Sequence, residues 1–163
     1  MTIVLNSNLR GVDMRFFTSF IIIIFSSTLF AFGTGEDSSD PKVKQAQEFI
    51  AKKEFDKAVP ILKEVIVADP KNADAFNYLG YSYRNLGNMD DALKNYQMAL
   101  SIDPNHKGAN EYLGELYLQK GDLPKAEERL QVLDKACPSD CVEHKTLKEQ
   151  IDNFKRNGNK SGY

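Results

Sequence analysis

Apolar residues recur at helical spacing on either side of a short turn near the middle of the chain. The turn is Leu-Gly-Asn at residues 86–88, and apolar positions on each side return every three or four residues. This spacing predicts two amphipathic helices that fold back on each other as a hairpin. The apolar positions are Phe76, Leu79, Tyr83 and Leu86 in the first helix, and Ala92, Tyr96, Ala99 and Leu100 in the second.

The same pattern recurs before and after this hairpin with a period of 34 residues. A fixed period of this length predicts stacked helical repeats that share their core with their neighbours. We therefore expect three copies, at 41–70, 73–104 and 107–138. The small residues that mark the copies are Ala58, Ala92 and Ala126, and the closing prolines are Pro70, Pro104 and Pro138.

The first copy departs most from the pattern. Ala46 stands where the later copies have a glycine inside the first helix, and Lys53 stands where they have a glycine in the turn. Terminal repeats are commonly atypical, so a hairpin is still expected here.

Glycine inside the first helix of the second copy needs a compensating reason. Gly80 costs about 1 kcal/mol relative to alanine at a helix-interior position. Together with the methyl groups of Ala92 and Ala99 it predicts a close approach of the two helices, with Tyr83 and Tyr96 filling the remaining space.

These residues resemble the tetratricopeptide repeat over roughly residues 39–138. The resemblance implies an all-α fold, a right-handed superhelix of three helical hairpins whose first helices line a concave binding face. The run 111–118 together with Cys137 and Cys141 further resembles exported bacterial members of that family. The signature positions filled in order are Phe76, Leu79, Gly80, Tyr83, Gly87, Ala92, Tyr96, Ala99 and Pro104.

The N-terminal segment 1–33 has the features of an export signal. The run Phe16–Phe32 is 17 residues of mostly apolar character that follow Arg10 and Arg15, and residues 31–33 at its end offer a small-x-small cleavage site. An uncleaved membrane anchor is the alternative, because 17 residues is at the short limit for crossing a bilayer. Export to the periplasm or envelope is expected, with 34–40 as a flexible spacer.

Charge argues against nucleic acid as a partner. Without residues 1–33 the chain keeps 19 basic and 22 acidic residues, a net charge of −3. The lysines alternate with acidic residues and form no basic stripe that would neutralise phosphates. The expected partner is another protein, with membrane contact only through an uncleaved N-terminal segment.

A capping helix is expected at 139–155, followed by a disordered tail at 156–163. Asp140 and Glu143 have capping-box spacing, and Leu147, Ile151 and Phe154 mark one apolar face. A helix with one apolar and one polar face can shield the last hairpin of a repeat array.

Cys137 and Cys141 are the only cysteines and lie across the junction between the third copy and the capping helix. In an exported protein they are expected to form a disulfide bond that fixes the local angle between two helices. Two other interpretations stay open. One is a redox-active dithiol, and the other is a soft-metal site in which His144 joins the two cysteines.

No pattern of catalytic residues is present, so neither an enzyme nor a cofactor is expected. His106 lies in a loop between two copies and is interpreted as a solvated turn residue without a role.

The resemblance implies a protein-binding groove lined by the first helix of each copy. A clamp for chaperone C-termini is doubtful, because other residue types stand where its polar and basic side chains are expected: Val43, Gln47, Tyr78, Gly108 and Tyr112. An extended segment with a basic residue for Glu111 and Glu115 and an acidic one for Arg84 fits better. The expected groove residues are Val43, Gln47, Ile50, Asn77, Tyr81, Arg84, Asn85, Glu111, Glu115 and Leu118.

Overall fold

The computed structural model describes residues 40–137 and 141–157, and these contain seven helices and no strand. The expected signal segment, most of the spacer and residues 158–163 lie outside the described residues. The helices are α1 (Pro41–Ala51), α2 (Phe55–Ala68), α3 (Ala73–Asn85), α4 (Met89–Ile102), α5 (Lys107–Gln119), α6 (Leu123–Ala136) and α7 (Val142–Arg156).

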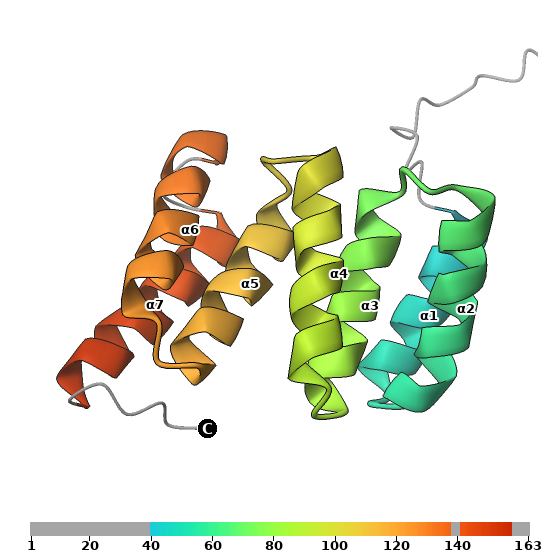
Figure 1. Ribbon diagram of the computed structural model, residues 1–163, viewed down its shortest axis with the longest axis horizontal. Helices are drawn as coiled ribbons and strands as arrows, with labels where there is room; N and C mark the ends of the chain where they lie inside the picture. The colour runs from blue at the N-terminus through green and yellow to red at the C-terminus, as the bar shows by residue number, and fades with distance from the viewer. Residues whose placement is uncertain (1–39, 138–140, 158–163) are drawn as a thin grey trace, which may run out of the picture. The chain divides into compact units, whose positions relative to one another are not determined.

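The first six helices pair as three hairpins, α1 with α2, α3 with α4, and α5 with α6 (Figure 1). Each hairpin also packs on the next, through α2 with α3 and α4 with α5, and α7 packs on both α5 and α6. The hydrophobic core is therefore distributed along the stack, with separate groups of buried side chains between successive hairpins. The predicted all-α fold of three hairpins followed by a C-terminal helix is confirmed.

Glycines occupy the closest helix crossings. A Cβ atom at Gly80 would lie 2.8 Å from two ring carbons of Tyr96 and 3.2 Å from the carbonyl oxygen of Ala92. Tyr96 is fully buried, so its ring has no open space to move into. In the next hairpin a Cβ atom at Gly114 would lie 2.6 Å from a methyl carbon of Leu147. Glycine at this position therefore lets α7 pack closely against α5.

The turn between the two helices of each hairpin requires a positive φ angle. Gly87 and Gly121 have φ angles of 82° and 78° in the second and third hairpins. In the first hairpin Lys53 takes the equivalent position with a φ of 59°. A lysine in the left-handed region costs roughly 1 kcal/mol relative to glycine, so the missing glycine changes the stability of this turn and not its path.

Side chains cap the first turns of four helices. Asp40 accepts a hydrogen bond from the backbone N–H of Lys42 and starts α1, and Asn72 accepts one from Ala75 and starts α3. Asp122 Oδ1 accepts from the N–H of Lys125 at 3.3 Å and starts α6. Each such bond satisfies one of the free N–H groups at a helix start.

His106 caps α5, which corrects its interpretation as a solvated turn residue. Its Nδ1 accepts a hydrogen bond from the N–H of Ala109 at 3.1 Å. Because Nδ1 acts as acceptor, the neutral ring carries its proton on Nε2, which lies 3.0 Å from Asp74 Oδ1 and donates to it. The ring thus joins the start of α5 to the first turn of α3.

The C-terminal helix α7 presents Leu147, Ile151 and Phe154 to the core, as their spacing predicted. It begins at Val142, with Cys141 as its N-cap residue and no side-chain hydrogen bond at this end, so Glu143 makes no capping box with a described residue. Cys137 and Cys141 form a disulfide bond with a Cα–Cα distance of 6.1 Å. Closing so short a loop stabilises the fold by about 2 kcal/mol on the chain-entropy account.

Helices of the length and apolar character needed to cross a bilayer are absent from the part of the chain that the structure describes.

Candidate functional site

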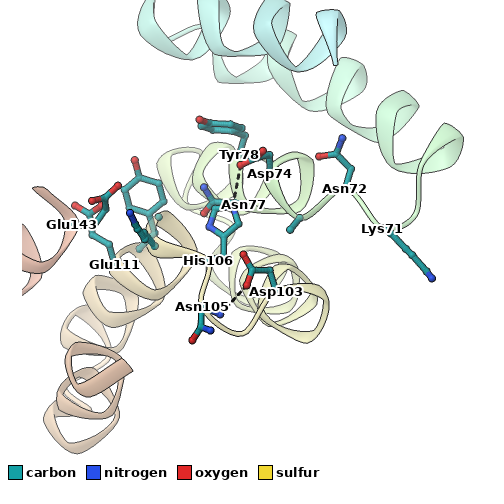
Figure 2. A pocket seen from close by; sticks show the side chains of 14 residues that line it. Lys71, Asn72, Asp74, Asn77, Tyr78, Asp103, Asn105, His106, Glu111 and Glu143 are labelled. Carbon is teal, nitrogen blue, oxygen red and sulfur yellow. Dashed lines mark hydrogen bonds and ion pairs between the residues drawn. The ribbon is translucent and has the colours of Figure 1, made fainter. Parts of the chain in front are cut away.

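A hollow with polar walls lies between the N-terminal halves of α3 and α5. It has a volume of about 630 Å³ and is referred to below as the α3–α5 pocket. Figure 2 shows Glu111 and Glu143 next to each other at one end of this pocket and Lys71 at the other. Its lining residues are Lys71, Asn72, Ala73, Asp74, Asn77, Tyr78, Asp103, Asn105, His106, Lys107, Gly108, Glu111, Tyr112 and Glu143.

Asn77 is the most buried polar side chain that lines the pocket. Asn77 is 3% exposed, and its Oδ1 atom accepts no hydrogen bond from any described residue. A Cβ atom at position 108 would lie 3.1 Å from Asn77 Nδ2, so glycine at this position leaves room for the amide. A buried acceptor without a donor costs free energy, and a ligand that supplies an N–H or O–H group would recover it.

Glu111 supplies a buried carboxylate to the same pocket. Burial raises the pKa of this carboxyl to about 7, and the negative charges of Glu115 and Glu143 act in the same direction. The charge of Arg84 and a hydrogen bond with Thr146 lower it by smaller amounts. The pocket therefore holds a carboxylate whose ionised form lacks sufficient compensating charge within the protein.

A second group of charged and aromatic side chains lies one helical turn further along α3 and α5. The guanidinium of Arg84 lies 5.5 Å from the ring centre of Tyr81 and 5.6 Å from that of Tyr112. Its Nη1 atom is 2.5 Å from Glu115 Oε2, and the two side chains are only 10% and 11% exposed. We call these four residues the arginine cluster, in which a cation is held by two aromatic faces and a carboxylate.

The structure distributes the predicted groove residues over three environments. Asn77 and Glu111 line the pocket, and Tyr81, Arg84 and Glu115 form the arginine cluster beside it. Asn85 is exposed at the end of α3, where its Nδ2 donates to the carbonyl oxygen of Tyr81. Gln47 and Ile50 are half-buried on α1, and Ile50 packs against the core.

Val43 and Leu118 were expected to line the groove, but the structure places both in the hydrophobic core. Val43 packs in the group shared by α1, α2 and α3, and Leu118 packs in the group shared with α7. The expectation for Arg84 and Glu115 also changes. They were expected to bind opposite charges on a ligand, but they form an ion pair with each other.

Several pocket residues were absent from the predicted set. Tyr78, Gly108 and Tyr112 had been noted only as positions where a chaperone-tail clamp would carry other residue types. Because these positions are equivalent to those of the chaperone-tail clamp, the sequence already indicated that they face a ligand. Asp74, His106 and Glu143 carried no such signal, because helical spacing within one helix does not show which neighbouring loop or helix closes a pocket.

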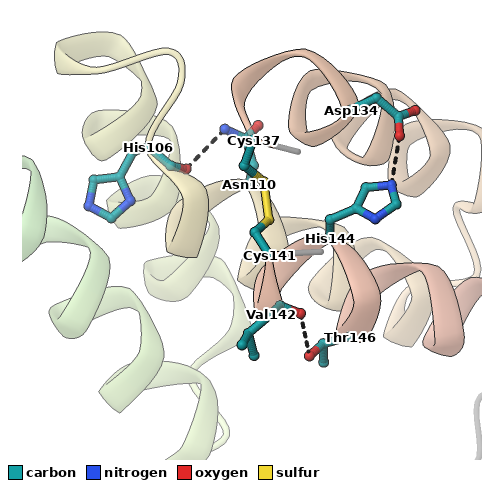
Figure 3. The surroundings of a disulfide bond; sticks show 8 residues. All are labelled: His106, Asn110, Asp134, Cys137, Cys141, Val142, His144 and Thr146. Atoms are coloured by element: carbon teal, nitrogen blue, oxygen red, sulfur yellow. Dashed lines mark hydrogen bonds and ion pairs between the residues drawn. A yellow bond between two sulfur atoms is a disulfide. The ribbon is translucent and has the colours of Figure 1, made fainter. Parts of the chain in front are cut away.

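The side chains near the disulfide bond do not form a common site with it. His144 turns away from the two sulfur atoms toward Asp134, with Nε2 2.6 Å from Asp134 Oδ1 (Figure 3). Among residues 40–137 and 141–157, no group of three or more His, Cys, Asp or Glu side chains is arranged to hold a metal ion.

The raised pKa of Glu111 predicts a pH dependence of stability. The folded chain keeps this proton up to about pH 7, whereas the unfolded chain loses it near 4.5. Between these values the folded state binds more protons, so the free energy of unfolding falls as the pH rises and stays low above 7. Glu111→Gln removes this contribution and is expected to raise the free energy of unfolding by about 2 kcal/mol at pH 8, with little effect at pH 4.

Urea unfolding at both pH values measures this difference. Glu149→Gln makes the same chemical change at an exposed position of α7 and serves as the control. An equal effect of the two substitutions at pH 8 would contradict the assignment of a buried, uncompensated carboxyl to Glu111.

Comparison with known proteins identifies the repeat. A family model described as the tetratricopeptide repeat matches residues 73–106, which include the second hairpin. A search of curated proteins found no match to the chain.

Solved structures with the same arrangement of helices are numerous. The type III secretion translocator chaperone SycD of Yersinia enterocolitica is 19% identical with a TM-score of 0.64, and the match covers 73% of this chain and 84% of that one. PcrH in complex with the chaperone-binding region of PopD is 22% identical with a TM-score of 0.64, covering 77% and 97%. The first repeat domain of Spaghetti (RPAP3), bound to the HSP90 peptide SRMEEVD, is 14% identical with a TM-score of 0.62, covering 71% and 90%. At these identities the likeness establishes the fold.

Proposed function

The chain has the tetratricopeptide-repeat fold, and from this premise we propose that it is a non-enzymatic interaction module that binds a segment of another protein in the α3–α5 pocket. The observation that carries the proposal is the pocket itself. It opens on the first helices of the second and third hairpins, and it contains a buried acceptor without a donor at Asn77. A protein segment supplies donors of the required kind through its backbone and side chains.

Peptide binding by similar structures supports this proposal. PcrH was solved with the chaperone-binding region of PopD, SycD with a peptide of the translocator YopD, and Spaghetti with an HSP90 peptide. Transferred to this chain, these examples favour an extended segment or a helix as the ligand. A role as a scaffold or assembly factor follows, since such roles require binding without a reaction.

We also propose that the protein acts outside the cytoplasm, in the periplasm or the envelope. The apolar run Phe16–Phe32 supports export, and it lies outside the described residues. The disulfide bond between Cys137 and Cys141 is compatible with an oxidising compartment.

Photo-cross-linking in intact cells of the source organism tests the binding site. The full chain carries a benzophenone amino acid at Tyr78, inside the pocket, or at Val67, which is 82% exposed on α2 and outside it. Discrete adducts are expected only from position 78, and the cross-linked peptides of the adduct should map to one short segment of a partner. Equal adducts from both positions, or none from position 78, would refute the proposed site.

A further inference from the structure

The arginine cluster and the α3–α5 pocket share a pattern of residue types that repeats along the same two helices. Tyr78 precedes Tyr81 by three residues on α3, and Glu111 precedes Glu115 by four residues on α5. Residues with these separations lie one turn apart on the same face of a helix. Tyr112 belongs to both groups, because it lines the pocket and also faces the guanidinium of Arg84.

The arginine cluster shows how this pattern is satisfied when a guanidinium is present. Arg84 is held against the rings of Tyr81 and Tyr112 and is paired with Glu115. The negative charge of Glu115 is therefore balanced, although the side chain is almost completely buried. This chain thus provides its own example of a tyrosine–carboxylate site filled by arginine.

The pocket has the same groups, but none of the described ion pairs joins Glu111 to its lining lysines, Lys71 and Lys107, and Lys71 lies at the opposite end of the pocket (Figure 2). Glu111 is 8% exposed and makes no ion pair with any described residue. Glu143 adds a second carboxylate close enough to raise the pKa of Glu111. Asn77 adds a buried Oδ1 atom that has no hydrogen-bond partner in the described chain. These three groups bring two carboxylates and an amide oxygen to one pocket, whose lining also includes the carboxylates of Asp74 and Asp103.

We propose that the α3–α5 pocket binds an arginine side chain of the partner segment, with Glu111 and Glu143 as its carboxylate partners and the rings of Tyr78 and Tyr112 as its walls. Asn77 Oδ1 accepts one of the remaining guanidinium N–H groups. This inference rests on the proposed function, since it specifies which residue of a bound segment the pocket recognises.

Arginine fits these groups better than other cations do. Its planar guanidinium has five N–H donors and stacks on aromatic rings, so it can satisfy two carboxylates and an amide oxygen together. A lysine ammonium has three donors and is more strongly hydrated, so its transfer into a tyrosine-lined pocket costs more. A metal ion is disfavoured, because no suitable group of three ligating side chains occurs among the described residues.

A positional peptide library tests the inference with the full, oxidised chain. The probes are acetylated heptapeptides with one fixed central residue and random flanks, and the fixed residue is arginine, lysine, citrulline, leucine or glutamate. Citrulline has nearly the shape of arginine without its charge. The arginine pool is expected to bind at least tenfold more tightly than the citrulline pool and several times more tightly than the lysine pool.

Variants assign this preference to the pocket. Glu111→Gln should reduce the preference of the arginine pool over citrulline at least fivefold, and Glu143→Gln should act in the same direction. Glu149→Gln, with the same chemical change on an exposed face of α7, should leave the preference unchanged. Circular dichroism confirms that each variant is folded.

The outcomes separate this inference from the proposed function. Binding of several pools without a preference for arginine, or with a preference for lysine or glutamate, overturns the inference and leaves the interaction module intact. An arginine preference that survives Glu111→Gln also overturns it, because the specificity then lies elsewhere. Failure of every pool to bind overturns both proposals.

Discussion

Leucine at position 80 is expected to abolish the cooperative folding of the repeat stack. The Cβ atom alone would lie 2.8 Å from the ring of Tyr96 and 3.2 Å from the backbone oxygen of Ala92. The ring is fully buried and the backbone cannot retreat within an intact hairpin, so the added carbon atoms have no space. Overpacking of this kind costs roughly 3 kcal/mol or more, a large part of the stability of a small domain. Thermal unfolding followed by far-ultraviolet circular dichroism should show a lost or strongly lowered transition.

Gly80→Ala gives a graded version of the same experiment. Alanine stabilises a helix interior by about 1 kcal/mol relative to glycine, whereas the contact with Tyr96 opposes it by roughly 1–3 kcal/mol. The net effect expected is a moderate loss of stability. Gln97→Leu places the same large side chain at an exposed position of α4 and should change the melting temperature little. A melting temperature for Gly80→Leu close to that of Gln97→Leu would disprove the close crossing.

The repeat architecture was predictable because it is encoded in residues that act locally. The 34-residue period, the closing prolines and the small residues at the crossings each specify a hairpin without reference to distant parts of the chain. Gly80 and Ala92 are buried at the crossing that the sequence indicated. The same reasoning predicted the apolar face of the C-terminal helix at Leu147 and Ile151.

The chemistry of the site was less predictable because it depends on pairs that lie far apart in sequence. Helical spacing placed Arg84 and Glu115 on the same side of the stack, but it did not show that the two side chains, 31 residues apart, reach each other. Leu118 has the spacing of a groove residue, yet α7 covers it. The position of α7 depends on packing against α5 and α6, which the pattern of α5 alone does not contain.

His106 shows a different limit of sequence reasoning. Serine, threonine, aspartate and asparagine are the usual capping residues, so the residue type of Asp122 is already typical of its position at the start of α6. Histidine is uncommon at this position, and its capping role follows only from the orientation of its ring toward the N–H of Ala109 and toward Asp74.

Removal of the Arg84 side chain is expected to destabilise the protein by about 3–5 kcal/mol. Arg84→Met keeps much of the aliphatic volume but leaves the carboxylate of Glu115 buried without its cation. A buried charge that loses its partner is far more costly than an exposed one, which is already solvated by water. Urea unfolding at neutral pH measures the loss. Lys94→Met, which removes the cation of an exposed pair with Asp91, should cost less than 1 kcal/mol.

The double variant Arg84→Met/Glu115→Met decides whether the pair is structural or is available to a ligand. If the two charges serve mainly to neutralise each other, replacing both with apolar side chains should recover most of the stability lost by Arg84→Met. Peptide binding in the α3–α5 pocket should then persist, because Glu111, Glu143 and Asn77 remain in place. A double variant that is fully stable but has lost all binding would indicate that Arg84 and Glu115 contact the ligand, as the sequence predicted. Retained binding with restored stability would establish that the arginine cluster supports the wall of the pocket while the residues one turn earlier contact the partner.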